Sequence, residues 1–201
     1  FVGLSGGLDS VALLHLINEK ILKSKTDSPW FGLKVKAIHV NHGLQTCSNN
    51  FEFTCKEICK KMGIELKVER LNIPNELIKK IGMEAAARKE RFNAFNTILE
   101  KDADILALGH HLDDQIETFF LQWIRGSGLE GLTGMLIFDE KIINQQNLNV
   151  WRPLLEITKS VIFDYAVAHK LEWIEDPTNQ NLEHDRNLIR HKVMPILKLI
   201  R

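Results

Sequence analysis

Short apolar runs and longer amphipathic runs alternate along this chain. Strand-like runs occupy residues 1–4, 35–40, 64–68 and 104–109, and runs with helical periodicity occupy about residues 10–23, 51–62, 84–99, 113–125, 158–169 and 184 onward. Such alternation is typical of an α/β fold. It predicts an open, mainly parallel sheet with helices on both faces and a C-terminal helical extension. The polar stretch 144–149 is interpreted as a loop, and a short β segment is expected at Val150 and Trp151.

The length of the chain fits one domain over residues 1–201. No apolar run approaches the length of a membrane span, and no signal-peptide pattern opens the sequence. The sequence begins inside the first strand-like run and ends inside a basic helical pattern, Lys192–Arg201, without a stop signal. We therefore expect a part of a longer protein, with further domains after Arg201.

The charges of the chain balance, with 26 basic and 26 acidic residues. A wholly basic surface for nucleic acid is therefore not expected. Basic residues do gather locally, at Lys79–Lys80, at Arg88–Arg91 and at Arg186–Lys192. Each cluster suits either a local patch for nucleic acid or an ordinary solvated helix face.

The three cysteines, Cys47, Cys55 and Cys59, are odd in number and form no Cys-x-x-Cys pair. This argues against a disulfide framework and against a four-cysteine zinc site. A reducing compartment, the cytoplasm, fits this cysteine usage best.

The strongest chemical pattern follows the first strand-like run, where Ser5-Gly6-Gly7-Leu8-Asp9-Ser10 leads into a helix. The glycine pair allows a tight turn and a close approach of the backbone to a ligand. The N–H groups at the helix start, together with its dipole, favour an anion such as phosphate. Ser5 and Ser10 can donate to phosphate oxygens, and Asp9 can hold a divalent cation against them. No Gly-Lys-Ser/Thr follows, so this is not a Walker-type loop, and a capped tight turn is the plain alternative.

A second polar cluster, His110-His111-Leu112-Asp113-Asp114-Gln115-Ile116-Glu117, opens the helix after the fourth strand-like run. Helical spacing places Glu117 on one face with Asp113 and with Asp114. Acids in a first helical turn also compensate the helix dipole, and a His/Asp cluster also suits a metal-dependent phosphohydrolase. Taken with the Gly-Gly loop, the cluster indicates chemistry with Mg²⁺ and phosphate.

Three polar segments follow strand-like runs: Ser5–Ser10, Asn41–Gly43 and His110–Asp114. In an open parallel sheet, ligands bind outside the carboxyl ends of the strands. We therefore expect the three segments to converge on one site.

The run Gly126–Gly131 matches the dinucleotide-binding fingerprint letter for letter. That fingerprint requires a preceding strand, whereas this run ends a helix. A dehydrogenase is therefore not favoured, and the glycines are expected to form a helix C-terminus and a flexible loop.

Further segments carry a resemblance to a known family. They are Val40–Leu44, Glu84–Arg88 with Arg91 and Phe92, Gly109–Glu117 continuing through Arg125–Leu132, Arg152–Leu155, Asp176–Asn179, and Arg186 to Arg190. Together with the Ser5–Ser10 loop they resemble the N-terminal catalytic domain of the tRNA(Ile)-lysidine synthase family, a branch of the PP-loop (N-type) ATP pyrophosphatases. The resemblance spans almost the whole chain and implies a Rossmann-like, adenine nucleotide hydrolase-like sheet. Asn41 and Gln45 stand where the family often has Asp and Arg.

The resemblance implies an ATP-dependent ligase acting on the anticodon wobble cytidine of tRNA(Ile) with a CAU anticodon. In the implied reaction, the cytosine C2 oxygen attacks the α-phosphate of ATP and releases pyrophosphate. The ε-amine of free L-lysine then attacks C2 and displaces AMP. ATP and Mg²⁺ are the implied cofactors, tRNA-binding domains are expected after Arg201, and the implied location is the cytoplasm. The oligomeric state is left open, with a homodimer among the alternatives.

Roles within that reaction follow from the resemblance and from residue chemistry. The Ser5–Ser10 loop would bind ATP, and Asp9 and Asp114 would position Mg²⁺ beside the leaving pyrophosphate. His110 and Glu117 would orient the nucleotide or the attacking lysine.

Three arginines complete the expected site. Arg88 would neutralise phosphates, because a guanidinium stays charged and offers bidentate contacts. Arg186 and Arg190 lie four residues apart on one helical face, and would hold tRNA phosphates or active-site acids. A plain surface position is the alternative for each. His39, inside the second strand-like run, is expected to be packed rather than catalytic.

Three other functions remain open at this point. A tRNA thiolase would share the fold, but it needs a sulfur-carrying cysteine or an iron–sulfur cluster, for which the cysteines supply no convincing set. A nucleotide-binding module would bind ATP without chemistry. A metal phosphohydrolase would cleave phosphoesters without ATP.

Overall fold

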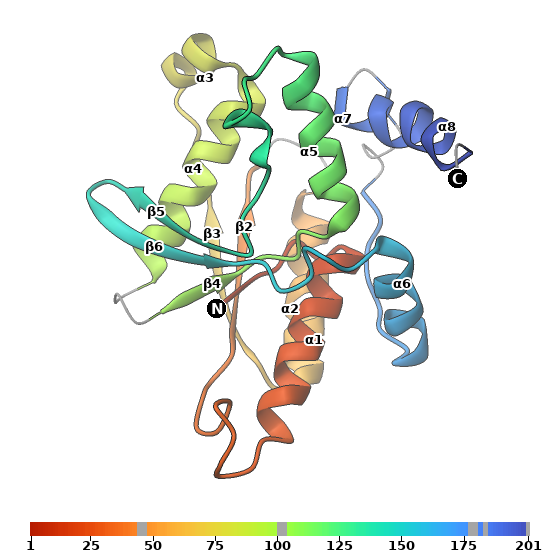
Figure 1. The fold of residues 1–201 in the computed structure, drawn as a ribbon. Helices are drawn as coiled ribbons and strands as arrows, with labels where there is room; N and C mark the ends of the chain where they lie inside the picture. The colour runs from red at the N-terminus through yellow and green to blue at the C-terminus, as the bar shows by residue number, and fades with distance from the viewer. Residues whose placement is uncertain (44–47, 100–103, 177–180, 183–184, 200–201) are drawn as a thin grey trace.

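The computed structural model describes residues 1–43, 48–99, 104–176, 181–182 and 185–199, and the statements below concern those residues. Figure 1 shows the arrangement of the helices and strands. In chain order they are β1 (Val2–Gly3), α1 (Leu8–Leu22), β2 (Lys36–Asn41), α2 (Ser48–Met62), β3 (Glu65–Arg70), α3 (Asn75–Ile81), α4 (Met83–Ile98), β4 (Ile105–Ala107), α5 (Leu112–Ile124), the 3₁₀ helix η1 (Gly131–Thr133), β5 (Phe138–Ile143), β6 (Gln146–Trp151), α6 (Lys159–Ala168), α7 (Asp185–Leu188), the π-helix η3 (Ile189–Val193) and α8 (Met194–Lys198).

The strands form one sheet of six, in the order β3-β2-β1-β4-β6-β5. Neighbours pair in parallel except β5 and β6, which form an antiparallel hairpin. The predicted open, mainly parallel sheet is therefore confirmed. Val2 of β1 lies opposite Ala37 of β2 and Ala107 of β4. Because these three strands run in the same direction, the loops after them come out at one edge of the sheet.

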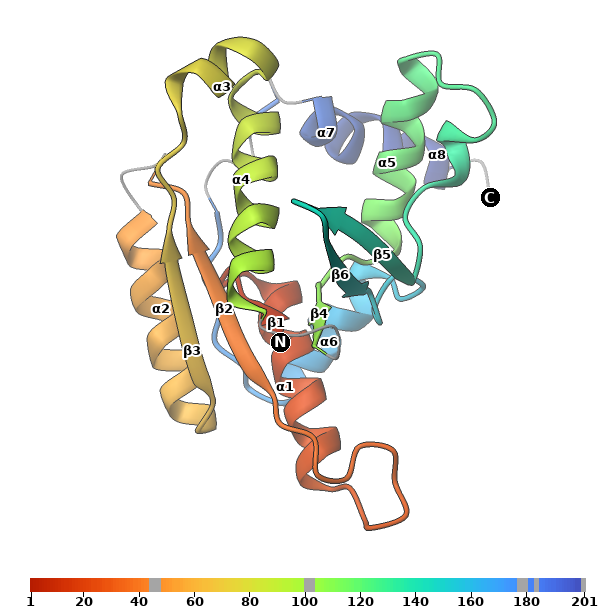
Figure 2. The same cartoon turned by 90° about the vertical axis from the view of Figure 1, so that its left-hand side faces the viewer.

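Helices cover both faces of the sheet, as Figure 2 shows. On one face, α1, α2 and α6 enclose an apolar core in which Leu13 and Leu14 are fully buried. On the other face, α4 packs Phe92 and Phe95 against Leu106 of β4. Burying one such large apolar side chain stabilises the fold by about 1.5–3 kcal/mol. None of the helices within the described ranges is long and apolar enough to cross a membrane.

The β5–β6 hairpin corrects the interpretation of residues 144–149 as a loop. Residues 146–149 are the first part of β6, and only Asn144 and Gln145 form the turn. Both turn residues have positive φ, 49° and 65°, as a two-residue hairpin turn of the primed type requires. The strand is held by Leu148 and Val150, which are buried at alternate positions. One apolar residue, Leu148, among five polar ones in residues 144–149 was too weak a pattern to predict a strand, whereas the expected β segment at Val150 and Trp151 is confirmed.

Two helical segments also differ from expectation. Helix α3, which follows Pro74, is not among the expected helices: it has only seven residues, and none of them is buried although Leu77, Ile78 and Ile81 have helical spacing. The single helix expected from residue 184 onward is divided into α7, η3 and α8. Pro195 in α8 has no N–H to continue an α-helical ladder, and the hydrogen bonds before it take the wider π spacing. A C-terminal helical extension is nevertheless present, as predicted.

Candidate active site

The loop between β1 and α1 holds its turn through Gly6. Gly6 has a φ of 87°, in the region that favours glycine. A Cβ at Gly6 would lie 3.3 Å from the Sγ of Cys55 and 3.3 Å from the Cγ2 of Ile174. The carbonyl of Gly6 also accepts a hydrogen bond of 2.9 Å from the N–H of Ile174. The loop is thus fixed between α2 and the segment after α6.

The two serines of this loop bond to the loop itself. The Oγ of Ser10 donates to the carbonyl of Gly7 at 3.0 Å and accepts from the N–H of Ser5 at 3.1 Å. The two hydroxyl oxygens lie 3.0 Å apart. Gly7 is the N-cap residue of α1, and no side chain caps this helix. The first N–H groups of α1 therefore keep their capacity to bind an anion, which is what the phosphate prediction requires.

His111 connects this loop to the second polar cluster. As the N-cap residue of α5, it accepts at Nδ1 from the N–H of Asp114 (3.3 Å), and its own N–H donates to the carboxylate of Asp114 (3.1 Å). Its Nε2 lies 3.6 Å from Oδ2 of Asp9 and 3.6 Å from Oδ2 of Asp114. Burial lowers the pKa of His111, but hydrogen bonding of its imidazole N–H to the carboxylate of Asp9 and the charges of Asp114, Asp9 and Asp113 outweigh it, so the pKa is raised. Asp9 and Asp114, the two acids predicted to position Mg²⁺, therefore both lie beside His111.

The chemistry of these acids fits a magnesium ion that is only partly held by the protein. Oδ1 of Asp9 is buried and has no hydrogen-bond partner. Within the described part of the chain, no group of three or more His, Cys, Asp or Glu side chains is arranged to hold a metal ion alone. Mg²⁺ commonly takes one or two carboxylates and completes its shell with substrate phosphates and water. Asp9 and Asp114 suit that arrangement, whereas Asp113 accepts a hydrogen bond from the N–H of Lys159 at 2.8 Å.

Glu117 is completely buried and is bound by arginines from the C-terminal segment. Nε of Arg190 donates to Oε1 of Glu117 at 2.6 Å, and Nη2 donates to Oε2 at 3.0 Å. Nε of Arg186 lies 3.6 Å from the same carboxylate. Nη2 of Arg190 also lies 3.7 Å from Oδ1 of Asp114. Of the three environments expected for these arginines (tRNA phosphates, active-site acids or a plain surface position), the structure places both beside acids of the site, Arg186 beside Glu117 and Arg190 beside Glu117 and Asp114.

A cavity of about 200 Å³ lies between the Ser5–Ser10 loop and the end of β4. Its polar lining residues are Ser5, Asp9, Ser10, His42, Arg91 and His110. Four of them have a buried side-chain atom without a hydrogen-bond partner: Oδ1 of Asp9, Nδ1 of His42, Nε of Arg91 and Nδ1 of His110. Because folded proteins pair nearly all buried polar atoms, such a cluster makes this cavity the candidate binding place for a polar ligand.

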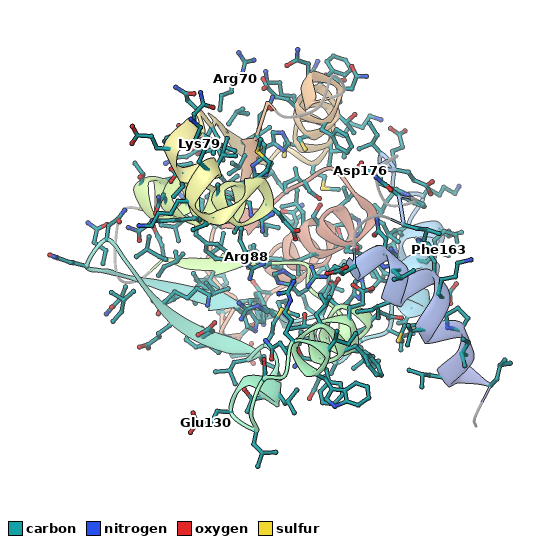
Figure 3. All side chains as sticks on the ribbon, turned by 90° about the horizontal axis from the view of Figure 1, so that it is seen from above. Arg70, Lys79, Arg88, Glu130, Phe163 and Asp176 are labelled. Atoms are coloured by element: carbon teal, nitrogen blue, oxygen red, sulfur yellow. The ribbon has the colours of Figure 1, made fainter. Side chains whose placement is uncertain are left out.

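His110 stands in a strongly positive environment. Burial lowers its pKa, and the charges of Arg152, Arg91, Arg88 and Arg186 lower it further, to about 3. The imidazole is therefore neutral at physiological pH and can act as a hydrogen-bond donor or acceptor. Figure 3, viewed from the end where α3, α5 and α7 lie, places Arg88 near the middle of this face. The site thus combines a neutral histidine with surrounding arginines, which suits a polyphosphate ligand.

Sequence reasoning did not single out Arg91 and Arg152 as site residues. Burial, then the charges of Arg88 and Arg186, lower the pKa of Arg91 to about 10. Arg152 is only 2% exposed, and its Nη1 donates to the carbonyl of Leu136 at 2.7 Å. The sequence offered one signal for each. Arg91 lies one helical turn after Arg88, and Arg152 directly follows the end of strand β6. His111 and His42 both lie in motifs noted in the sequence, but the sequence analysis did not predict that His42 lines the cavity or that His111 contacts both Asp9 and Asp114.

The cysteines that the structure describes are packed thiols. Cys55 and Cys59 are free and buried on α2, and burial raises their pKa values to about 12 and about 11. Sγ of Cys55 lies 3.3 Å from Nδ1 of His39, whose ring also contacts the carbonyl of Leu4 at 2.9 Å. The prediction that His39 is packed is confirmed.

Several expectations concern other parts of the chain. Gly126 has a φ of 73° and its N–H bonds to the carbonyl of Trp123, so the glycine run does end α5, as predicted. Gln45, Cys47 and residues 177–179 lie outside the described residues.

The parallel sheet, the glycine turn after β1 and the acidic start of α5 beside it have the arrangement of a nucleotide-binding α/β domain. The chain belongs to the PP-loop domain family, which matches residues 1–197. It is 36% identical over 196 residues to the tRNA(Ile)-lysidine synthase of Actinobacillus pleuropneumoniae serotype 3 (strain JL03), covering 98% of this chain and 42% of that protein. It is 39% identical over 196 residues to the tRNA(Ile)-lysidine synthase of Haemophilus ducreyi (98% and 41%) and 38% identical over 200 residues to that of Nitrosomonas europaea (98% and 40%). The chain therefore spans about two fifths of the length of these curated relatives.

Two solved structures share the fold at low sequence identity. A U34-tRNA thiolase from Methanococcus maripaludis, solved with its [4Fe-4S] cluster, superposes with a TM-score of 0.66 at 22% identity, covering 98% of this chain and 71% of the thiolase. FMN adenylyltransferase from Candida glabrata, in complex with FAD and inorganic pyrophosphate, superposes with a TM-score of 0.54 at 14% identity, covering 83% and 47%. At these identities the likeness concerns the fold alone, and it agrees with the predicted Rossmann-like sheet.

Proposed function

We propose that this domain, as part of a cytoplasmic protein, uses ATP and Mg²⁺ to adenylate the wobble cytidine of a tRNA(Ile) with a CAU anticodon. Free L-lysine then attacks C2 of the cytosine, a C–N bond forms, and AMP leaves. The names of the curated relatives support the tRNA substrate. The observation that carries the proposal is the cluster of unpartnered buried polar atoms around the 200 Å³ cavity beside the Ser5–Ser10 loop.

The loop and its neighbours would bind the nucleotide. The first N–H groups of α1 and the serine hydroxyls would stabilise the leaving pyrophosphate, which gains negative charge as the α-phosphate is attacked. Asp9 and Asp114 would hold Mg²⁺, which when bound neutralises charge on the phosphate oxygens. Arg88 and Arg91 would add positive charge to the same cavity without needing to reorganise.

His110 and Glu117 would have different tasks. His110, neutral and with an unpartnered Nδ1, can bond to the nucleotide or to the cytosine. Both oxygens of Glu117 are already bound by Arg190, so the geometry favours a positioning role over direct contact with the attacking lysine. Through that pair, Glu117 would hold the C-terminal segment against α5 and keep Arg190 close to Asp114.

A tRNA thiolase is the second candidate, because its fold is similar. Thiolation requires an accessible sulfur nucleophile or a cluster ligated by cysteines. The described thiols of Cys55 and Cys59 are buried with raised pKa values, which disfavours that role for either of them.

The test mixes the full-length protein with ATP, Mg²⁺, labelled lysine and a tRNA(Ile) transcript with a CAU anticodon. We expect lysine incorporation that requires every component and falls about 100-fold or more in Asp9→Asn, because a metal-holding carboxylate is lost from the transition state. The matched control is Asp27→Asn, at an exposed loop position after α1, which should leave the rate unchanged. Sulfur incorporation in place of lysine, or equal activity of Asp9→Asn and the wild type, would contradict the proposal.

A further inference from the structure

A second cavity, of about 380 Å³, lies between α4 and the β5–β6 hairpin. We refer to it as the α4–hairpin groove; its walls include Arg88, Lys89 and Asn93 of α4 and Lys141, Ile142 and Asn144 of the hairpin. Figure 2 shows the hairpin beside α4. Three of the lining residues are arginine or lysine, and among the described residues no carboxylate lines the groove.

The positive charge of this groove is a local feature. The chain as a whole has equal numbers of basic and acidic residues, so an acid-free basic groove does not follow from its composition. Cζ of Arg88 lies 5.6 Å, and Nζ of Lys141 lies 5.9 Å, from the ring centroid of Phe92. The helix and the hairpin thus each bring a cation close to one buried ring, that of Phe92. Asp139 compensates Lys141 at 2.9 Å, but Arg88 and Lys89 keep a net positive charge in the groove.

The groove is connected to the candidate active site through Arg88. Arg88 lines the groove, and its charge is also one of those that lower the pKa of His110. Figure 3 shows Arg88 between α4, the hairpin and α5. Arg88 of the groove is therefore close enough to the candidate active site for its charge to act on His110, a residue of the cavity beside the Ser5–Ser10 loop.

The lining favours a nucleotide chain over a small anion. A single phosphate would fill only a small part of the groove, whose remaining wall is apolar, from Ala85, Ile142 and Ile143. Sites for single-stranded nucleic acid combine cations that follow the backbone with apolar surface for ribose and bases, and side-chain amides that bond to polar edges. Asn144, at the exposed turn of the hairpin, supplies such an amide at the rim.

We propose that the α4–hairpin groove binds the phosphodiester backbone of the RNA strand that flanks the nucleotide entering the active site. The inference rests on the proposed function, since it takes the substrate to be an RNA loop. Lys89 and Lys141 bind flanking phosphates, while Arg88 stands where the groove meets the active site. The cations position the strand and do not read its sequence.

The test uses the full-length protein with Lys89→Glu and with Lys141→Met, which keeps the apolar stem of that side chain. Lys60→Glu, an exposed helical lysine on α2 at the other face of the sheet, is the matched control for Lys89→Glu. The probe is a fluorescent RNA stem-loop with a CAU loop, titrated by anisotropy at several salt concentrations. We expect Kd to rise about threefold to tenfold in each groove variant, and the slope of log K against log salt to fall by about 0.7 per lost contact. The control and the KM for ATP should not change.

The outcomes separate this proposal from the proposed function. Weakened RNA binding in both groove variants supports the groove even if no lysine is incorporated, in which case the proposed function alone fails. Wild-type RNA affinity and salt slope in Lys89→Glu and Lys141→Met overturn the groove, whatever the lysine assay gives. Displacement of the RNA by poly-L-glutamate or inorganic phosphate at equal ionic strength would also overturn it, because the groove would then bind anions of any kind. Circular dichroism melts of all variants confirm that each is folded.

Discussion

Removing either partner of the Glu117–Arg190 pair is expected to destabilise the domain strongly. Breaking a buried ion pair costs about 3–5 kcal/mol, because the remaining charge stays buried without its partner. Arg190→Met leaves a fully buried carboxylate, although Arg186 remains 3.6 Å away. We therefore expect a loss near the lower limit, about 3 kcal/mol, in the free energy of unfolding. Glu117→Gln should cost less, about 2 kcal/mol, because the side chain of Arg190 is 24% exposed and can reach water.

The double variant distinguishes a specific interaction from general damage to packing. If the two side chains act as a pair, Glu117→Gln/Arg190→Met will cost less than the two single changes together, by about 1–2 kcal/mol. Urea unfolding followed by tryptophan fluorescence measures all three values, since the chain has four tryptophans. The exposed pair Lys61–Glu172 provides a control cycle, in which no coupling is expected. A coupling below about 0.5 kcal/mol for Glu117 and Arg190 would refute the reasoning, because distant sites add to within that value.

Three further results are expected. Gly134→Ala will lower the free energy of unfolding by about 1–3 kcal/mol, because Gly134 has a φ of 74° and a Cβ there would lie 2.9 Å from the amide of Gln115; an unchanged Tm would contradict this. Hydrogen bonds led by the one from Arg70 hold the pKa of Glu52 well below its usual range. Glu52 therefore stabilises the fold fully above about pH 4.3 and loses this contribution as the pH falls through its folded-state pKa, so Arg70→Met should flatten the acid side of the stability curve. The Cys55 thiol, 0% exposed and with its pKa raised to about 12 by burial, should resist iodoacetamide at about pH 8 until urea unfolds the chain, and rapid native labelling would disprove this.

The sheet could be predicted because its strands and helices have strong local patterns. The run around Val11–Ile17 is apolar at all positions but His15, the strand Lys36–Asn41 contains Ala37, Ile38 and Val40, and these apolar residues are mostly buried as expected. The hairpin was missed for two reasons. Only Leu148 and Val150 of β6 are buried, and neither of the two turn residues with positive φ is a glycine. Helix α3 was missed because its seven residues are too few to establish a helical period in the sequence.

The candidate site could be predicted only in part. The convergence of the loops after β1, β2 and β4 follows from parallel strands, and motif spacing was enough to propose it. The pairing of Glu117 with Arg190 joins positions 73 residues apart, and no local pattern specifies it. The unpartnered atoms of Arg91 and His42 likewise depend on burial by other segments, which a sequence read along the chain does not show.

The hydrogen bond between Gly6 and Ile174 has a consequence for how the domain is made. Contacts between segments far apart in the chain form late in folding, since a long loop must close before they contribute. During synthesis from the N-terminus, the Ser5–Ser10 turn leaves the ribosome before Ile174, the residue that holds it, which follows only after α6. A nascent chain that stops before Ile174 contains the Ser5–Ser10 loop but lacks the hydrogen bond from Ile174 that holds it. Nucleotide affinity should therefore rise only as the domain nears completion, which makes ATP binding a marker of finished folding.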